Sequence, residues 1–264
     1  MVLLGDEIAA LERNLWSQWA RFGAPADCAW QEQDGVSWLE TPIASLPYNG
    51  VFRFDVPVET ADARMDALIH SFDARQVNHV WLLHPSARPE DIEARLNARG
   101  FSEFEVLLGM VADPGMLQAD TPPADGVEIR EITRSEETPI LELVADRWSV
   151  PTDALHHLQS FFRSNRLGEP GAGIRGWMAT INGQPVGKAF INVTGKVGGL
   201  YGVAIKPEAR GRGVGLAICA EALRATVAAG ADLLVLHSTP MAVELYRRMG
   251  FREVAPFSVF ARGG

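Results

Sequence analysis

Apolar and polar residues alternate with two different periods along the second half of the chain. Residues 127–132 alternate between apolar and charged side chains, which is typical of a half-buried strand. Two further apolar segments, 176–181 and 186–193, are joined by Asn182-Gly183, a dipeptide that favours a tight hairpin. This part of the chain therefore contains an antiparallel group of strands.

Segments with the apolar spacing of helices lie between these strands. Thr133 and Glu136 have the spacing of a capping box for a helix that continues to about residue 146. The segment from about residue 213 repeats apolar residues on one helical face and ends at Gly230. The full set of predicted elements is strand 127–132, helices 133–146 and 153–165, strands 176–181, 186–193 and 200–205, helix 213–230, strand 232–237, helix 241–249 and strand 258–261. The order β-α-α-β-β-β-α-β-α-β predicts a mixed α/β fold.

The first half begins with an amphipathic helix over residues 5–21, which we expect to pack on that half. A stretch rich in proline, glycine and aspartate, residues 113–126, favours a linker. The chain is therefore divided into an N-terminal domain 1–113, a linker 114–126 and a C-terminal domain 127–264.

A weak internal repeat relates the two halves. Residues 80–101 and 234–251 both give a strand ending in histidine (His84, His237), a turn, a helix and Gly-Phe. A strand is expected after each copy. Coincidence between two ordinary β-α-β segments is the alternative, because glycine after a helix is common.

Composition narrows the class of protein. The chain has 264 residues, a net charge of −9 and 47% hydrophobic residues. No basic patch favours nucleic acid as a partner, and no apolar run reaches membrane-spanning length. The start of the chain lacks a basic segment, so we expect no signal peptide and a cytoplasmic location. Cys28 and Cys219 have no metal-type spacing, and burial is expected for both.

A glycine-rich arginine loop carries the chemistry. After an apolar strand and Pro207, the chain has Arg210, Gly211, Arg212, Gly213, Val214 and Gly215, and then the predicted helix. Glycines let backbone N–H groups approach an anion, and the start of a helix attracts negative charge. The spacing matches neither the dinucleotide fingerprint Gly-x-Gly-x-x-Gly/Ala nor a P-loop, which needs a lysine.

The pattern Arg-x-x-Gly-x-Gly resembles the acyl-CoA loop of the GNAT (Gcn5-related N-acetyltransferase) superfamily. A second segment, Leu-Tyr246-x-x-x-Gly250-Phe251, resembles that family's last core helix. The resemblance covers residues 127–261 and implies a GNAT fold with acetyl-CoA as co-substrate and no metal. It also implies that the N-terminal half is a degenerate GNAT-like half, because it has Leu96 in place of Tyr246 and lacks the loop.

The resemblance assigns roles residue by residue. The loop from Arg210 to Gly215 would bind the pyrophosphate, although Arg212 could equally be a solvated surface residue. The backbone of Val203, Ala204 and Ile205 would bind the pantetheine arm. Tyr246 would protonate the leaving thiolate, the alternative being a core tyrosine. Thr239 stands where the family often has asparagine.

Several residues compete as the general base. Some family members carry glutamate on the strand before the loop, but the matching residue here is Gly199. His237 is a candidate because imidazole titrates near neutrality, yet His84 at the matching site suggests a structural residue instead. Tyr201 is a weaker candidate, and a water relay needs no side chain.

The substrate side is not identified. Trp148, His156, His157, Phe161 and Phe162 lie on the first two helices, where packing is the alternative to recognition. We expect a small-molecule or peptide amine as acceptor, no nucleic-acid or membrane partner, and a monomer or homodimer. The alternatives are a transferase for another acyl-CoA or an O-nucleophile, and an acyl-CoA-binding sensor without turnover.

Overall fold

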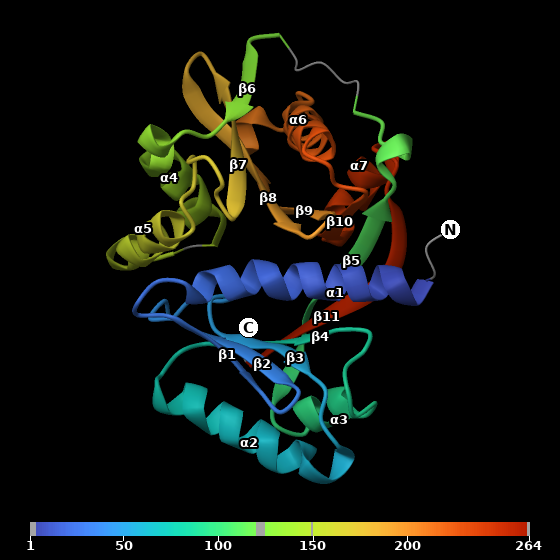
Figure 1. Cartoon of the computed structure of the whole chain (residues 1–264). Coiled ribbons are helices and arrows are strands. Elements are labelled where there is room, and N and C mark those ends of the chain that lie inside the picture. Colours follow the sequence, from blue (N-terminus) through green and yellow to red (C-terminus); the bar gives the residue numbers. More distant parts are fainter. Residues whose placement is uncertain (1–3, 120–124, 149, 263–264) are drawn as a thin grey trace.

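The computed structural model describes residues 4–119, 125–148 and 150–262, without the side chains of residues 135, 137, 138 and 145–148. Within this part of the chain, eleven strands form one sheet in the order β1-β2-β3-β4-β11-β5-β10-β9-β8-β7-β6, with helices on both faces (Figure 1). Two strand pairs, β3·β4 and β9·β10, are parallel, and the others are antiparallel. The expected mixed α/β class with a mostly antiparallel sheet is confirmed.

The elements of the first half are α1 (Leu4–Ala20), β1 (Ala29–Gln33), β2 (Val36–Glu40), β3 (Gly50–Phe54), α2 (Val58–Ala74), β4 (Val80–Leu83), α3 (Ile92–Asn97) and β5 (Phe101–Ala112). Those of the second half are β6 (Val127–Glu131), α4 (Glu137–Trp148), α5 (Leu155–Ser164), β7 (Ile174–Ile181), β8 (Gln184–Thr194), β9 (Val197–Ile205), α6 (Val214–Ala228), β10 (Leu233–Ser238), α7 (Val243–Arg248) and β11 (Arg252–Arg262). The predicted order of elements in the second half is confirmed.

Local sequence explains several of these boundaries. Asn182 and Gly183 both have positive φ, as the tight turn between β7 and β8 requires. Gly230 has φ +95° just after α6, where a left-handed residue ends the helix. The side chain of Glu136 accepts hydrogen bonds from the amide and hydroxyl of Thr133, in agreement with the predicted cap.

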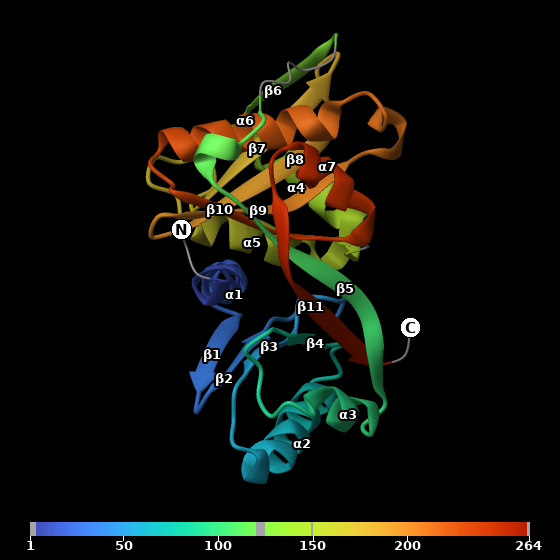
Figure 2. The same ribbon diagram turned by 90° about the vertical axis from the view of Figure 1, so that its right-hand side faces the viewer.

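The last strand is much longer than the predicted segment 258–261, and its partners explain why. β11 pairs with β5 along its whole length and with β4 from Ser258 to Ala261. β5 in turn pairs with β10. Each half therefore places its last strand in the sheet of the other half (Figure 2). Hydrogen bonds to β5 make β11 longer than the short apolar segment from which the strand was predicted.

The repeat is larger than the sequence indicates. In the first half the segment β3-α2-β4-α3-β5 has the same order of elements and the same parallel strand pair as β9-α6-β10-α7-β11 in the second. The strands β4 and β10 are neighbours of β11 and β5 respectively. The two halves are thus related across the β5·β11 pair at the centre of the sheet.

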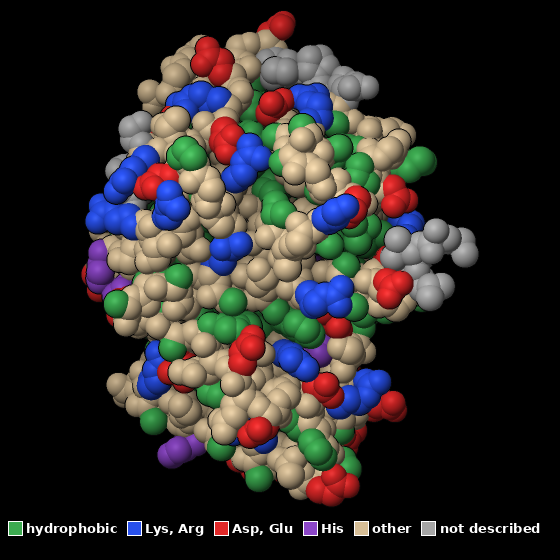
Figure 3. Space-filling view, in the orientation of Figure 1, with side chains coloured by type: hydrophobic (Ala, Val, Ile, Leu, Met, Phe, Trp, Pro, Cys, Tyr) green, Lys and Arg blue, Asp and Glu red, His purple; other side chains and the backbone are tan. Residues whose placement is uncertain are grey.

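Helix α1 packs on both halves, so the expectation that it covers only the first half is incomplete. Its Trp16 indole donates to Phe52 O at 2.7 Å in the first half. Its Asn14 side chain donates to Val197 O at 3.2 Å in the second half. Figure 3 shows a group of hydrophobic side chains just below the level that α1 occupies in Figure 1.

Three other expectations concern the linker, the two cysteines and membranes. Part of the predicted linker 114–126 lies outside the described residues, and the domain boundaries stay a prediction. Cys219 is buried on α6, while Cys28 is only half-buried. No helix in the described part of the chain is both long and apolar enough to cross a membrane.

The central strand pair leads to a stability prediction. A Cβ on Gly109 of β5 would lie 2.7 Å from a ring carbon of Phe257 and 3.1 Å from Leu11 of α1. Gly109→Ala should therefore destabilise the protein by about 1–3 kcal/mol, because the neighbours must move apart. Because β5 belongs to both half-sheets, calorimetry should show one transition at a lower temperature.

Gly115→Ala is the matched control, since a Cβ there meets no atom within 4 Å. Two separate melting transitions, or equal melting temperatures for the two variants, would contradict the shared core.

Candidate active site

The loop between β9 and α6 presents unpaired backbone donors. Gly211 and Gly213 have φ of +74° and +75°, a left-handed conformation that glycine adopts without strain. Among the described residues, the amides of positions 211–216 donate to no acceptor, and Ala217 N–H gives the first helical bond, to Gly213 O at 3.0 Å. Six N–H groups at the start of a 15-residue helix form a site suited to an anion.

The space around the loop suits a close approach by a ligand. Residues 210–213 are exposed, and a Cβ on Gly211 or Gly213 would meet no protein atom within 4 Å. The Nε of Arg210 donates to Ile205 O at 3.1 Å, which ties the loop to the end of β9. Arg212 is also exposed. The loop residues therefore fit a phosphate group, with cationic side chains at its edge.

Beside the loop, β9 separates from β10. Their parallel ladder has four pairs, from Val197↔Leu233 to Leu200↔Leu236, although β9 continues to Ile205. The stretch Val203–Ile205 follows this ladder and precedes the loop. An extended arm can add to such an open strand edge by backbone hydrogen bonds.

A β-bulge lies in the same stretch of β9. Lys188 faces Ala204 and Phe190 faces Tyr201, so Gly202 and Val203 together oppose Ala189. Gly202 has φ +58°, and its carbonyl accepts a hydrogen bond from Lys188 Nζ at 2.6 Å. Lys188 is only 1% exposed. A bulge redirects backbone groups, and this buried lysine fixes its geometry. Sequence reasoning missed Lys188, because nothing in the strand pattern distinguishes a lysine that faces the core.

Tyr246 lies on α7 with its ring packed 6.1 Å from that of Phe251. Burial, followed by the neighbouring Cys219, raises the pKa of Tyr246 well above its usual value. The phenol therefore stays protonated at neutral pH. The side chain is only 6% exposed, and its hydroxyl bonds to no described residue.

His237 lies at the end of β10, and Thr239 follows it at the start of the turn Pro240–Ala242 that leads into α7. The His237 ring packs edge-on against Phe257 at 4.5 Å, and both ring nitrogens are buried without a partner among the described residues. Burial lowers the pKa of His237 to about 3, although the charge of Glu12 opposes this shift. The imidazole is therefore neutral at pH 7, and its role as general base stays a prediction.

Tyr201 and Gly199 lie on the face of β9 that is covered by α1. The hydroxyl of Tyr201 donates to Asn14 Oδ1 at 2.7 Å, and burial raises the pKa of Tyr201 well above its usual value. A phenol in this state is a poor base at neutral pH. Sequence reasoning missed Asn14, since a polar residue on an amphipathic helix usually faces solvent.

The aromatic residues of α5 pack rather than form an open surface. Phe161 stacks on Phe22 at 4.0 Å, and Phe162 lies 5.9 Å from Phe190. His157 Nδ1 lies 2.6 Å from the carboxylate of Asp27. His156 is exposed, and the side chain of Trp148 lies outside the described residues.

The corresponding gap in the first half is filled by the chain itself. β3 and β4 have two pairs, after which His84 Nε2 accepts the Phe54 N–H at 3.2 Å. Arg88 N–H donates to Phe54 O at 2.9 Å. The segment after β4 therefore occupies the edge of β3 that corresponds to the open edge of β9.

Glu12 fixes this closure. Its Oε1 lies 3.0 Å from His84 Nδ1 and accepts the Ser86 N–H at 2.8 Å. Because a backbone N–H can only donate, His84 Nε2 is an acceptor and Nδ1 carries the proton. Burial raises the pKa of Glu12, but its hydrogen bonds outweigh burial and hold the pKa below its usual value. His84 is thus a structural residue.

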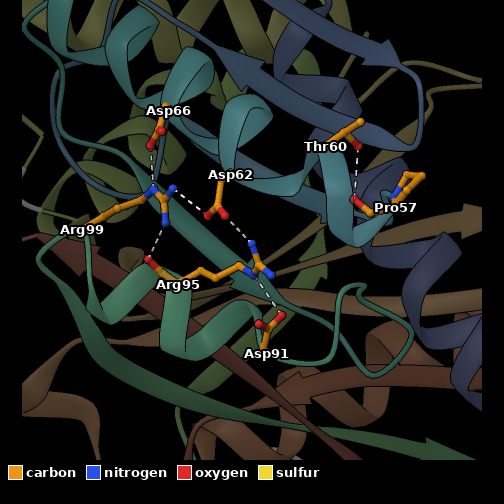
Figure 4. Close-up of polar contacts among 7 residues, drawn as sticks. All are labelled: Pro57, Thr60, Asp62, Asp66, Asp91, Arg95 and Arg99. Carbon is orange, nitrogen blue, oxygen red and sulfur yellow. Dashed lines mark hydrogen bonds and ion pairs between the residues drawn. The ribbon is translucent and has the colours of Figure 1, made fainter.

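Arginines of the first half are also engaged. Arg95 of α3 and Arg99, which follows this helix, pair with Asp62, Asp66 and Asp91 at 2.6–2.9 Å (Figure 4). The start of α2 has Pro57 and Val58 in place of glycines. This half therefore lacks the combination of open edge, glycine loop and available arginine among its described residues.

Comparison with known proteins identifies the fold and a family segment within it. Residues 172–253 match the family model described as acetyltransferase (GNAT) domain. A comparison with curated proteins gives no match. A GCN5-related N-acetyltransferase from Kribbella flavida superposes with a TM-score of 0.70 at 20% identity, covering 95% of both chains.

Two more solved structures share the fold. A tandem GNAT protein from the clavulanic acid biosynthesis pathway has a TM-score of 0.63 at 13% identity, covering 91% of this chain and 85% of that one. A conserved protein of unknown function from Staphylococcus epidermidis has a TM-score of 0.65 at 17% identity, covering 88% and 92%. The chain therefore has the GNAT fold. Its residues 172–253 match the model of the GNAT acetyltransferase domain.

The loop geometry predicts the effect of a bulky side chain. Gly213→Val should abolish acetyl-CoA binding, because valine is strained at positive φ and its side chain fills the space in front of the amides. Isothermal titration calorimetry measures the affinity. Gly230→Val carries the same strain at the other end of α6, where a Cβ also meets no atom, and should bind normally. Equal affinity in both folded variants would refute the loop as the binding site.

The filled edge of β3 predicts one acetyl-CoA per chain. The segment from His84 to Arg88 already makes the backbone bonds that an arm would need. The same titration gives the stoichiometry, and a value of two would contradict the closure.

Proposed function

We propose that this protein is an acetyl-CoA-dependent N-acetyltransferase that acts on a primary amine of a small molecule or peptide. Transfer is by direct attack within a ternary complex. The observation that carries the proposal is the row of six unpaired amides at 211–216 beside the open edge of β9, within a GNAT domain. The GCN5-related N-acetyltransferase from Kribbella flavida, which shares this fold, supports the same reaction class.

The loop and β9 hold the co-substrate. Amides from Gly211 to Gly215 bind the pyrophosphate, and Arg210 and Arg212 add charge at its edge. The backbone of Val203, Ala204 and Ile205 binds the pantetheine arm, and Thr239 offers a hydroxyl on the opposite side. A backbone N–H at the bulge polarises the thioester carbonyl.

The reaction forms an amide bond and breaks a thioester bond. Acetyl-CoA supplies the acyl group and a thiolate leaving group. The amine must be neutral when it attacks, and it loses one proton overall, which His237 or water accepts. The thiolate gains one proton, which Tyr246 donates from its hydroxyl. Protons balance when solvent returns the tyrosine to its neutral form.

The test is a screen of small primary amines, amino acids and short peptides for release of free CoA thiol. Acetyl-CoA is the donor at saturating concentration, with longer acyl-CoAs as a second series. Release that depends on both amine and acetyl-CoA supports the proposal. Tight acetyl-CoA binding without turnover of any amine or alcohol would favour a sensor instead.

Tyr246→Phe should lower kcat by about 10²-fold or more while changing acetyl-CoA affinity little, since the hydroxyl acts mainly as the thiolate departs. The buried ring is kept, so the melting temperature should stay close to that of the wild type. Tyr48→Phe is the matched control, because Tyr48 is also a buried tyrosine but lies in a different core cluster. An unchanged kcat in Tyr246→Phe would make Tyr246 a structural residue.

A further inference from the structure

Helix α1 presents a polar face to the second half. Asn14 is completely buried, and its Nδ2 donates to Val197 O at 3.2 Å, Asn192 O at 3.3 Å and Thr194 Oγ1 at 3.3 Å. Two turns later, Arg21 Nε donates to Asn192 Oδ1 at 2.6 Å. A buried polar side chain needs such partners, and α1 is therefore fixed in one register on the sheet.

The bonds of Asn14 also fix the direction of the next hydrogen bond. Backbone carbonyls can only accept, so Nδ2 must face Val197 and Asn192 and the carbonyl Oδ1 must face Tyr201. Because an amide oxygen cannot donate, the Tyr201 hydroxyl donates to Asn14 at 2.7 Å. The lone pairs of the Tyr201 oxygen are then left to accept a proton donor.

Gly199 explains why the partner of the Tyr201 hydroxyl, the Asn14 amide, comes from α1. A Cβ on Gly199 would overlap Asn14 Oδ1. No side chain larger than hydrogen fits at this position of β9 while α1 is in place. The polar atom beside Tyr201 is therefore supplied by the first half of the chain rather than by the strand.

Tyr201 and His237 stand where β9 and β10 separate. The last pair of the ladder is Leu200↔Leu236, so these two residues come next on the two strands. Their rings are nearly parallel, with centroids 6.2 Å apart and 19° between planes. Both ring nitrogens of His237 are buried and unpaired within the described part of the chain. An unpaired buried polar atom costs about 1–3 kcal/mol, which a docked polar group would recover.

We propose that α1 completes the part of the transferase site that binds the amine substrate. Asn14 is the positioning residue: it accepts the hydrogen bond of the Tyr201 hydroxyl and so leaves the Tyr201 oxygen to accept a hydrogen bond itself. The amine substrate then places an N–H group between the Tyr201 oxygen and a ring nitrogen of His237. Neutral imidazole offers one acceptor nitrogen, so both residues favour a donor such as an amine over a group that can only accept. This inference rests on the proposed function and assigns the acceptor's place within it.

The decisive experiment is a double-mutant cycle on Asn14→Ala and Tyr201→Phe, assayed with the most active amine of the screen. Each single variant should raise the KM for the amine and lower kcat/KM about tenfold, the effect of one lost hydrogen bond in a buried site. The double variant should lose no more than either single one, because Asn14 acts through Tyr201. Calorimetry should give acetyl-CoA affinities within about twofold of wild type for all three.

Thr194→Val is the control for the bonds that hold α1 on the second half. It removes one partner of Asn14 Nδ2 and leaves the bond from Tyr201 to Asn14 intact. We expect wild-type kinetics from it. If Asn14→Ala does not fold, Tyr201→Phe decides alone, since that variant keeps all the Nδ2 bonds of Asn14.

The outcomes separate the two proposals. A change of less than twofold in kcat/KM for Tyr201→Phe, or losses that multiply in the double variant, would overturn the role of Asn14 while transfer by the wild type stands. Failure of the wild-type protein to bind acetyl-CoA or to release CoA would instead overturn the proposed function, and this inference with it.

Discussion

The backbone hydrogen bonds between β5 and β11 join the two halves, and the rest of the architecture depends on them. Each of these strands is the last of its own half, yet each lies beside the second-to-last strand of the other. The sheet is therefore continuous from β1 to β6. The apolar face at its centre spans both halves, and α1 covers it with Leu11 and Leu15 buried beneath. Neither half could close its core without the other's strand.

A repeated order of elements produces different sites in the two halves. In both, a parallel strand pair separates after a few residues and exposes a backbone edge. In the first half, His84 and Arg88 bond to that edge at Phe54, and Glu12 of α1 holds the segment in place. In the second half, no described residue pairs with the edge of β9 beyond Leu200 or with the amides of the loop beside it. Backbone groups in a strand edge need hydrogen-bond partners. The chain itself supplies them at the edge of β3, whereas the edge of β9 is left for a ligand.

Polar groups of α1 serve both halves at once. Glu12 faces the first half and accepts from Ser86, while Asn14 faces the second and accepts from Tyr201. Residues two apart on a helix point in widely different directions, so one helix can satisfy buried donors on both sides of the interface. The geometry of the open site is thus coupled to the packing of the filled one, and the first half has a structural reason to persist without a loop of its own.

The sequence alone determined the local features of the second half. Signals that act over a few residues predicted three features. These are the hairpin at Asn182-Gly183, the glycine-rich loop and the helix that follows Gly213. Tertiary structure decided the rest. The length of β11, the exchange with β5 and the approach of Asn14 to Gly199 all involve partners more than a hundred residues apart. The double role of α1 combines such contacts with others to residues 36–74 positions away. No periodicity encodes such contacts, because a strand or helix face shows only that it is buried and not what it is buried against.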